Sequence, residues 1–218
     1  MFALISPTTA LTVGVLALVG VRLVGGVRVS LSGEGRRIVS RVVSGIRWRH
    51  LWPVPFVLTG VVVAASVLLR IPGLDWGWWS ALGGIGNPVT GSTEQTVGTA
   101  WEWIVPLAFV TLLVPALPLF AYAEERIFRT GAQHWTRPRR ALKIVQFGLI
   151  HALIGVPIGV ALALSVGGGY FMGVYLRAYR RTASVTEATY ESTRAHTAYN
   201  AVIVSLVLTL ALMTAFGL

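Results

Sequence analysis

The chain contains no cysteine and a single aspartate, Asp75, among its 218 residues. Without cysteine it can form no disulfide, no thiolate nucleophile and no cysteine-ligated metal site, and it cannot itself carry a prenyl group on a C-terminal cysteine. A lone aspartate excludes the paired carboxylates of an aspartyl protease. The HExxH motif of zinc peptidases and the Gly-x-Ser-x-Gly elbow of serine hydrolases are also missing. These absences exclude most of the familiar hydrolase sites.

Charge is scarce as well. Only 12% of the residues are charged, 55% are hydrophobic and the mean hydropathy is +0.72, whereas a soluble domain carries about 25% charged residues. A helix needs about 20 apolar residues to cross a bilayer. Stretches without Asp, Glu, Lys or Arg cover residues 1–21, 51–69, 104–123, 144–176 and 195–218. The composition therefore predicts a membrane protein, with four of these stretches forming one span each.

The stretch 144–176 is too long for one crossing and short for two. We interpret it as a tight hairpin that turns either near Gly167–Gly169 or at Pro157–Gly159, with a short or tilted second arm. This gives an all-α polytopic membrane bundle of about six transmembrane helices with the N-terminus outside. We expect it in the plasma membrane.

The formal net charge of +10 is unevenly distributed along the chain. Of the 18 basic residues, 17 fall in 22–50, 126–143 and 177–194, and the segment 71–100 has none. With six spans these three basic segments share one face, which the positive-inside rule places in the cytoplasm. The charge is thus explained by topology and by contact with the lipid bilayer, and we expect no nucleic-acid partner.

Two of the basic segments contain helix signals. Ile38, Val42 and Ile46 recur at helical spacing and suggest a short helix on the inner membrane surface, although a solvated basic linker explains them equally well. The sequence Ser-Val-Thr-Glu at 184–187 reads as a capping box. A helix that begins there should continue into the last span.

Ionisable side chains within membrane spans are costly and usually functional. Most acids and histidines of this chain lie in loops or at the ends of spans. The exceptions gather near the cytoplasmic ends of spans three, four and six, where they could share one pocket; with a neighbouring amide they are Glu124, Glu125, His151, His196 and Asn200.

Their spacing forms three motifs. Residues 124–129 read EExxxR, 147–151 read FxxxH and 196–200 read HxxxN. In this order on successive hydrophobic segments, they resemble the CPBP family of intramembrane proteases, which includes the type II CAAX prenyl endopeptidases and bacteriocin-processing proteins. The resemblance covers about 122–218. We therefore divide the chain into 1–100, two N-terminal transmembrane helices with a basic cytoplasmic loop and an outer loop, and a CPBP-like protease core over 101–218.

The resemblance implies a glutamate-type endopeptidase that hydrolyses a peptide bond of a CAAX-like tail or bacteriocin-like peptide at the cytoplasmic side of the membrane. Glu124 would be the general base on a water molecule that His151 orients, and His196 and Asn200 would stabilise the oxyanion. A poorly solvated carboxylate and preformed donors suit these tasks. Structural support would come from Glu125, Arg129 and Phe147.

Other interpretations stay open. Glu124 could be a solvated carboxylate at a helix end, and His151 and Asn200 could form hydrogen bonds between helices. No cofactor is expected, although zinc is possible if Glu124, His151 and His196 are three metal ligands with an open fourth position. A non-catalytic scaffold or immunity protein would bind the same peptides without turnover. A transporter is a further alternative, but we find no inverted repeat.

Overall fold

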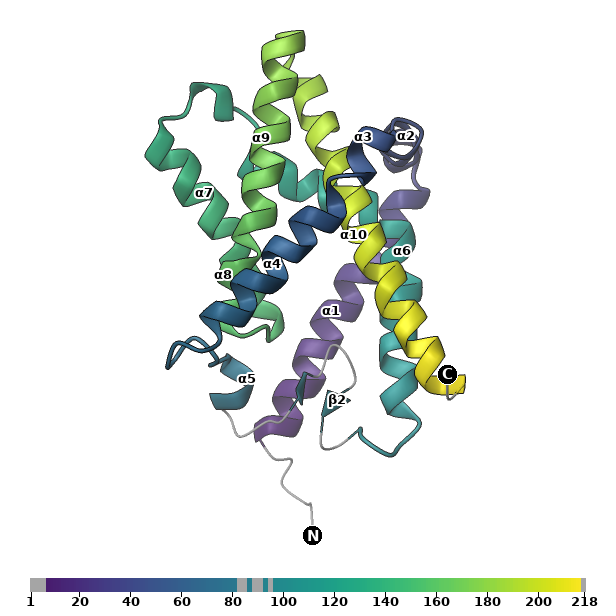
Figure 1. The fold of residues 1–218 in the computed structure, drawn as a ribbon. Coiled ribbons are helices and arrows are strands. Elements are labelled where there is room, and N and C mark those ends of the chain that lie inside the picture. Colours follow the sequence, from purple (N-terminus) through teal and green to yellow (C-terminus); the bar gives the residue numbers. More distant parts are fainter. Residues whose placement is uncertain (1–6, 82–85, 88–91, 94–95, 217–218) are drawn as a thin grey trace.

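The computed structural model describes residues 7–81, 86–87, 92–93 and 96–216. These residues are almost entirely helical (Figure 1). A two-residue antiparallel pairing joins β1 (Gly86–Asn87) to β2 (Ser92–Thr93) in the segment between α5 and α6. The helices are α1 (Pro7–Leu31), α2 (Gly33–Val43), α3 (Trp48–Leu51), α4 (Val54–Leu68), α5 (Trp78–Ala81), α6 (Trp101–Phe128), α7 (Arg137–Leu149), α8 (Ile158–Ala163), α9 (Ser165–Thr182) and α10 (Val185–Phe216). The prediction of an all-α bundle is confirmed.

Within the described residues, four helical segments are long and apolar enough to cross a membrane, which indicates a membrane protein. They are Thr9–Leu31, Trp48–Leu68, Trp101–His134 and Ile158–Thr182. The first runs past the expected end at residue 21 and includes Arg22 and Arg28; long arginine side chains allow this because they can reach the interface from inside a span. Residues 1–6 of the expected first span lie outside the described residues. Six spans and an outside N-terminus stay predictions.

The region expected to form a hairpin turns at Gly155–Pro157. Helix α7 is followed by a short 3-10 helix, η3 (Ile150–Ile154), and then by Gly155, whose φ of 86° lies in the left-handed region that glycine tolerates. The chain then returns through α8 and α9. Of the two expected turns, the one at Pro157–Gly159 is therefore the closer, and Gly167–Gly169 lie inside α9. The first arm, α7, has only 13 residues, so here the shorter arm is the first.

Both helix signals in the basic segments correspond to helices. Helix α2 covers Ile38 and Val42 and is capped by Ser32, whose hydroxyl accepts a hydrogen bond from the Gly35 N–H. Helix α10 begins at Val185, where the Ser184 hydroxyl accepts a hydrogen bond from the Glu187 N–H. Figure 1 shows α2, α3 and the α9–α10 junction at one end of the bundle, and α5 and β2 at the other. The arginine-rich segments around α2 and the α9–α10 junction are therefore neighbours in space.

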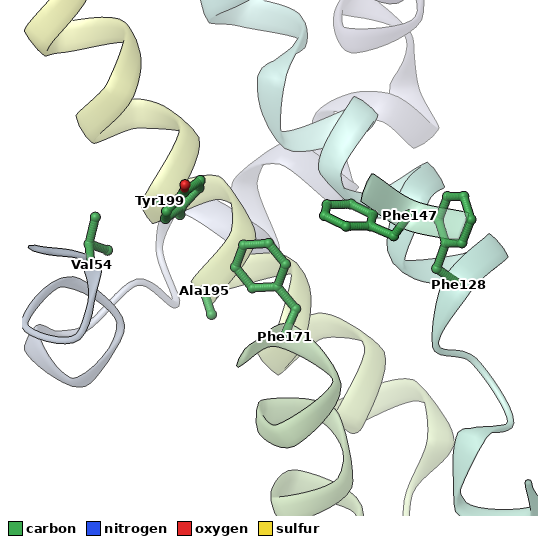
Figure 2. Packing of buried hydrophobic residues seen from close by; sticks show 6 residues of the cluster. All are labelled: Val54, Phe128, Phe147, Phe171, Ala195 and Tyr199. Carbon is green, nitrogen blue, oxygen red and sulfur yellow. The ribbon is translucent and has the colours of Figure 1, made fainter. Parts of the chain in front are cut away.

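The core lies where α6, α7, α9 and α10 meet. An aromatic cluster fills it and Figure 2 shows its members: Val54, Phe128, Phe147, Phe171, Ala195 and Tyr199. Phe147 meets Phe128 and Phe171 edge-on, with ring centroids 5.6 and 5.9 Å apart. Gly168 makes this packing possible, since a Cβ there would lie 2.9 Å from the Phe147 ring. These four helices, and α4 through Val54, are thereby held together around the polar residues described next.

Candidate functional site

Glu125 is the centre of a buried polar cluster. It lies in the last turn of α6 with no exposed surface, and its Oε1 accepts hydrogen bonds from Arg129 Nη1 at 2.8 Å and from His196 Nδ1 at 2.9 Å. Its Oε2 accepts a hydrogen bond from the Ser192 hydroxyl of α10. Arg129 follows one helical turn after Glu125, and Ser192 precedes His196 by one turn, so each helix presents two members on one face. The cluster therefore joins α6 to α10.

These contacts fix the state of one nitrogen of His196. An ionised carboxylate only accepts hydrogen bonds, and Arg129 and Ser192 already donate to Glu125. The short contact from His196 Nδ1 to the same carboxylate therefore requires a proton on Nδ1. The other nitrogen, Nε2, takes no part in the contact with Glu125 and is available for a second interaction.

Aromatic rings enclose His196 and Arg129. The His196 ring stacks on Phe171 with centroids 4.4 Å apart and meets Phe147 edge-on at 5.4 Å. The guanidinium carbon of Arg129 lies 4.1 Å from the centroid of Phe147. His196 is only 2% exposed. Its orientation is thus fixed by packing as well as by hydrogen bonds.

Glu124 approaches His196 from the same helix end. Its Oε2 lies 3.7 Å from His196 Nε2, too far for a direct hydrogen bond, and has no hydrogen-bond partner among the described residues. The side chain as a whole keeps 32% of its surface exposed. The two neighbouring glutamates therefore differ in environment: Glu125 is fully paired and buried, whereas Glu124 has a free oxygen facing the imidazole.

A cavity of about 150 Å³ lies beside His196. His151, His196 and Asn200 all line it, together with Phe147, Phe171 and Tyr199. His151 lies in η3, and its Nδ1 is 2.9 Å from the Phe147 carbonyl oxygen. Because a carbonyl only accepts, Nδ1 donates in this contact, and Nε2 has no hydrogen bond to the part of the chain that the structure describes.

The structure thus brings the predicted residues together in two groups that share His196. Glu124 contacts His196, and His151 and Asn200 lie with His196 on the cavity, but Glu124 is not among the residues that line it. The predicted Glu125–Arg129 pair is present, and Phe147 packs against both His151 and His196. Sequence analysis missed Ser192 and Phe171. The spacing of Ser192, one turn before His196, was the available signal for the first.

The described residues contain no group of three or more His, Asp or Glu side chains placed to hold a metal ion. The expected zinc ligands Glu124, His151 and His196 are not grouped together: Glu124 faces His196 Nε2 at 3.7 Å but does not line the cavity that His151 and His196 line. We therefore assign no step to a metal. A zinc-dependent mechanism stays a prediction for metal analysis of the purified protein.

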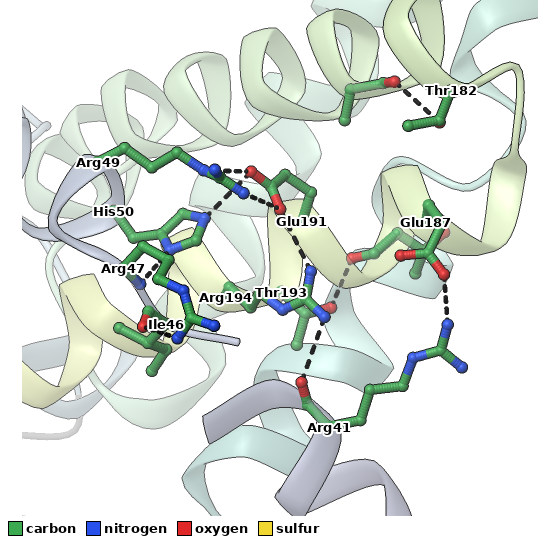
Figure 3. Close-up of polar contacts among 12 residues, drawn as sticks. Arg41, Ile46, Arg47, Arg49, His50, Thr182, Glu187, Glu191, Thr193 and Arg194 are labelled. Atoms are coloured by element: carbon green, nitrogen blue, oxygen red, sulfur yellow. Dashed lines mark hydrogen bonds and ion pairs between the residues drawn. The ribbon is translucent and has the colours of Figure 1, made fainter. Parts of the chain in front are cut away.

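A second charged cluster anchors the start of α10 (Figure 3). Glu191 is only 7% exposed, and its carboxylate contacts Arg49 at 2.9 Å, His50 at 3.2 Å and Arg194 at 3.2 Å. Arg194 also donates to the carbonyl of Arg41 in α2. These contacts hold α2 and α3 against the helix turn that precedes His196. The polar start of α10 is thus a structural joint between α2, α3 and α10.

The pKa of Glu191 yields a pH prediction. Burial raises this pKa, but hydrogen bonds and charge from His50 and Arg49 outweigh burial and lower it from 4.5 to about 2. A lowered folded-state pKa stabilises the fold above the ordinary pKa, and this contribution is lost as the pH falls from 4.5 through 2. We expect Glu191→Gln to be less stable than wild type by about 1–3 kcal/mol at pH 7, with the difference disappearing toward pH 2. Denaturation midpoints across this range measure it.

Glu187→Gln is the matched control. Glu187 lies one turn earlier on α10, but its ion pair with Arg41 is exposed, with 42% of the Glu187 side-chain surface accessible. Exposed pairs contribute about 0–1 kcal/mol, so this variant should follow wild type across the pH range. A constant difference between Glu191→Gln and wild type from pH 7 to 2 would contradict the assignment.

Comparisons of the chain with protein-family models, curated proteins and solved structures found no match. The functional conclusion therefore rests on the geometry of these residues.

Proposed function

We propose that this chain is an intramembrane endopeptidase that hydrolyses a peptide bond of a membrane-associated protein or peptide. The observation that supports it best is the environment of His196. One ring nitrogen is fixed by the buried Glu125 at 2.9 Å, and the other faces the unpaired Oε2 of Glu124 at 3.7 Å. A carboxylate with a free oxygen beside a fixed imidazole places a base and a hydrogen-bond donor next to each other, as peptide hydrolysis needs.

In the proposed reaction, Glu124 accepts a proton from a water molecule as the water oxygen bonds to the scissile carbonyl carbon. The carbonyl oxygen becomes an oxyanion, which donors on His196 and Asn200 stabilise. The proton then passes from Glu124 to the leaving nitrogen as the C–N bond breaks. His151, whose Nδ1 is held by the Phe147 carbonyl, orients the water through its free nitrogen. Glu125 positions His196, because its carboxylate accepts the hydrogen bond from Nδ1–H and so holds the ring in one orientation.

The substrate class follows from the setting. A site at the end of apolar helices favours a peptide that is itself tethered to the membrane, such as a CAAX-like tail or a bacteriocin-like peptide at the cytoplasmic face. The small cavity beside His196, about 150 Å³, is lined mainly by aromatic and aliphatic side chains and suits one apolar residue of such a peptide.

The test is cleavage by the wild-type protein in liposomes. We expect cleavage of quenched fluorescent CAAX-like peptides or of members of a membrane-peptide library, with the cut bond mapped by mass spectrometry. Cleavage that survives a chelator in protein free of zinc supports the glutamate mechanism. Cleavage that is lost with the metal favours the zinc alternative. Binding of peptides without any cleavage would contradict the proposal and favour a scaffold or immunity role.

A further inference from the structure

A second cavity, of about 420 Å³, opens beside the Glu191 joint. It lies between α3, with the two residues that lead into α4, and α9, and Glu191 of α10 also lines it. Its lining includes three arginines, two aromatic residues and one acid: Arg49, Trp52, Tyr170, Arg177, Arg181 and Glu191. It shares no lining residue with the cavity that contains His151 and His196. It is therefore a separate site, and the proposed peptidase reaction does not use it.

Positive charge exceeds negative charge around this cavity. Glu191 is its only acidic lining residue among the described residues, against three arginines. Glu191 is already contacted by Arg49 at 2.9 Å and by Arg181 at 3.7 Å, and it also binds Arg194 outside the cavity. One carboxylate cannot neutralise these cations. Arg177 has no ion pair within the described part of the chain, and it is exposed.

The arginines keep unused donors. The side chains of Arg49 and Arg181 remain 54% and 57% exposed although both contact Glu191. A guanidinium carries five N–H donors in a planar fork that matches the oxygens of a phosphate. Three such forks around a cavity of ligand size form an anion site.

The position of the cavity relative to the candidate membrane spans indicates which class of anion it binds. The candidate span Trp48–Leu68 begins at this cavity and the candidate span Ile158–Thr182 ends at it. The cavity is thus at the level where a bilayer has its headgroups. Trp52, 53% exposed at the rim, is a residue type that favours this level. A phosphate that reaches this position most readily is part of a lipid, and basic pockets between helix ends are suited to such headgroups.

We propose that this cavity binds the phosphate headgroup of an anionic phospholipid. The lipid phosphate occupies the space between Arg49, Arg177 and Arg181, and its acyl chains extend along the apolar surface of α4 and α9. Bound lipid would add a counter-charge that Glu191 alone does not supply and would strengthen the joint between α3, α9 and α10.

The test is lipid retention by the purified full-length protein, measured by native mass spectrometry after incubation with phosphatidylglycerol or phosphatidylcholine. Wild type should retain phosphatidylglycerol in preference. Arg177→Gln should weaken this retention about tenfold, as expected for the loss of one charge-assisted contact. Arg177→Lys, which keeps the charge, should recover part of it.

Arg180→Gln is the matched control, because Arg180 is exposed on the same helix turn but does not line the cavity. It should retain phosphatidylglycerol as wild type does. Equal losses in Arg177→Gln and Arg180→Gln would show that only general surface charge matters, which overturns the proposal. Equal retention of phosphatidylcholine would also overturn it. So would displacement of the lipid by millimolar inorganic phosphate, which would identify a soluble phosphate as the ligand.

Discussion

Glu124→Gln should reduce the rate of peptide cleavage in liposomes by about 10²–10⁴-fold, the contribution typical of a general base. Glutamine has the same shape as glutamate but cannot accept a proton from water at neutral pH. The Oε2 atom of Glu124 is buried, faces His196 Nε2 at 3.7 Å and has no hydrogen-bond partner among the described residues. The lost function is therefore chemical, and the expected change lies in kcat more than in KM.

The fold should tolerate this substitution. Glu124 keeps 32% of its side-chain surface exposed, whereas Glu125 has none. An unchanged unfolding transition, measured alongside activity, separates loss of the base from loss of structure. Glu102→Gln serves as the control on the same helix, since Glu102 is a solvent-accessible acid in the first turn of α6 and accepts a hydrogen bond from the Gly98 N–H. Equal cleavage by Glu124→Gln and wild type would show that Glu124 is not the base.

The relation between Glu124 and Glu125 shows how far the sequence could go. The spacing of four between Glu125 and Arg129 predicts a pair on one helix face, and such a pair is present at 2.8 Å. Adjacent residues point about 100° apart on a helix, so one glutamate had to differ from the other in environment. The elements that surround each glutamate are set by the packing of α10 against α6. Helical periodicity carries no information about this packing.

Ser192 and Glu191 illustrate the same limit. Both lie in a polar stretch before the last span, and the only signal of burial in the sequence is the spacing of Ser192, one helical turn before His196. The structure buries both because α3 packs on α10 from one side and α9 from the other. These contacts join residues that are 21 positions apart for Ser192 and Phe171 and 142 positions apart for Arg49 and Glu191. Local patterns cannot encode them.

The hydrophobic stretches, by contrast, located most of the long helices well. They predicted the ends of the helices poorly, because the length of a charge-free stretch is a poor measure of the length of a helix. Helix α1 continues ten residues beyond the charge-free stretch, to Leu31, because an arginine side chain does not interrupt backbone hydrogen bonding. After α7 the arm continues only through the short 3-10 helix η3, which ends at Gly155, two residues before Pro157.

The largest effect on stability is expected from Arg129→Met, which should lower the free energy of unfolding by about 3–5 kcal/mol. Arg129 is fully buried, and its guanidinium pairs with Glu125 at 2.8 Å while lying on the ring of Phe147. Methionine fills part of this volume but leaves the Glu125 carboxylate without its cation. Thermal or denaturant unfolding in detergent measures the change.

Arg126→Met is the control for this substitution, because Arg126 lies on the same helix with an exposed side chain. Exposed substitutions of this kind usually change stability by no more than about 0.5 kcal/mol. If both variants unfold at the same point as wild type, the buried pair does not stabilise the fold.

The double variant Glu125→Gln/Arg129→Met should lose less free energy of unfolding than the sum of the losses of the two single variants, since neither partner is then left as an unpaired buried charge. This double variant should nevertheless be inactive, because His196 Nδ1 then lacks the carboxylate that holds its proton. Stability that is partly recovered without any recovery of activity distinguishes a positioning role of Glu125 from a purely structural one.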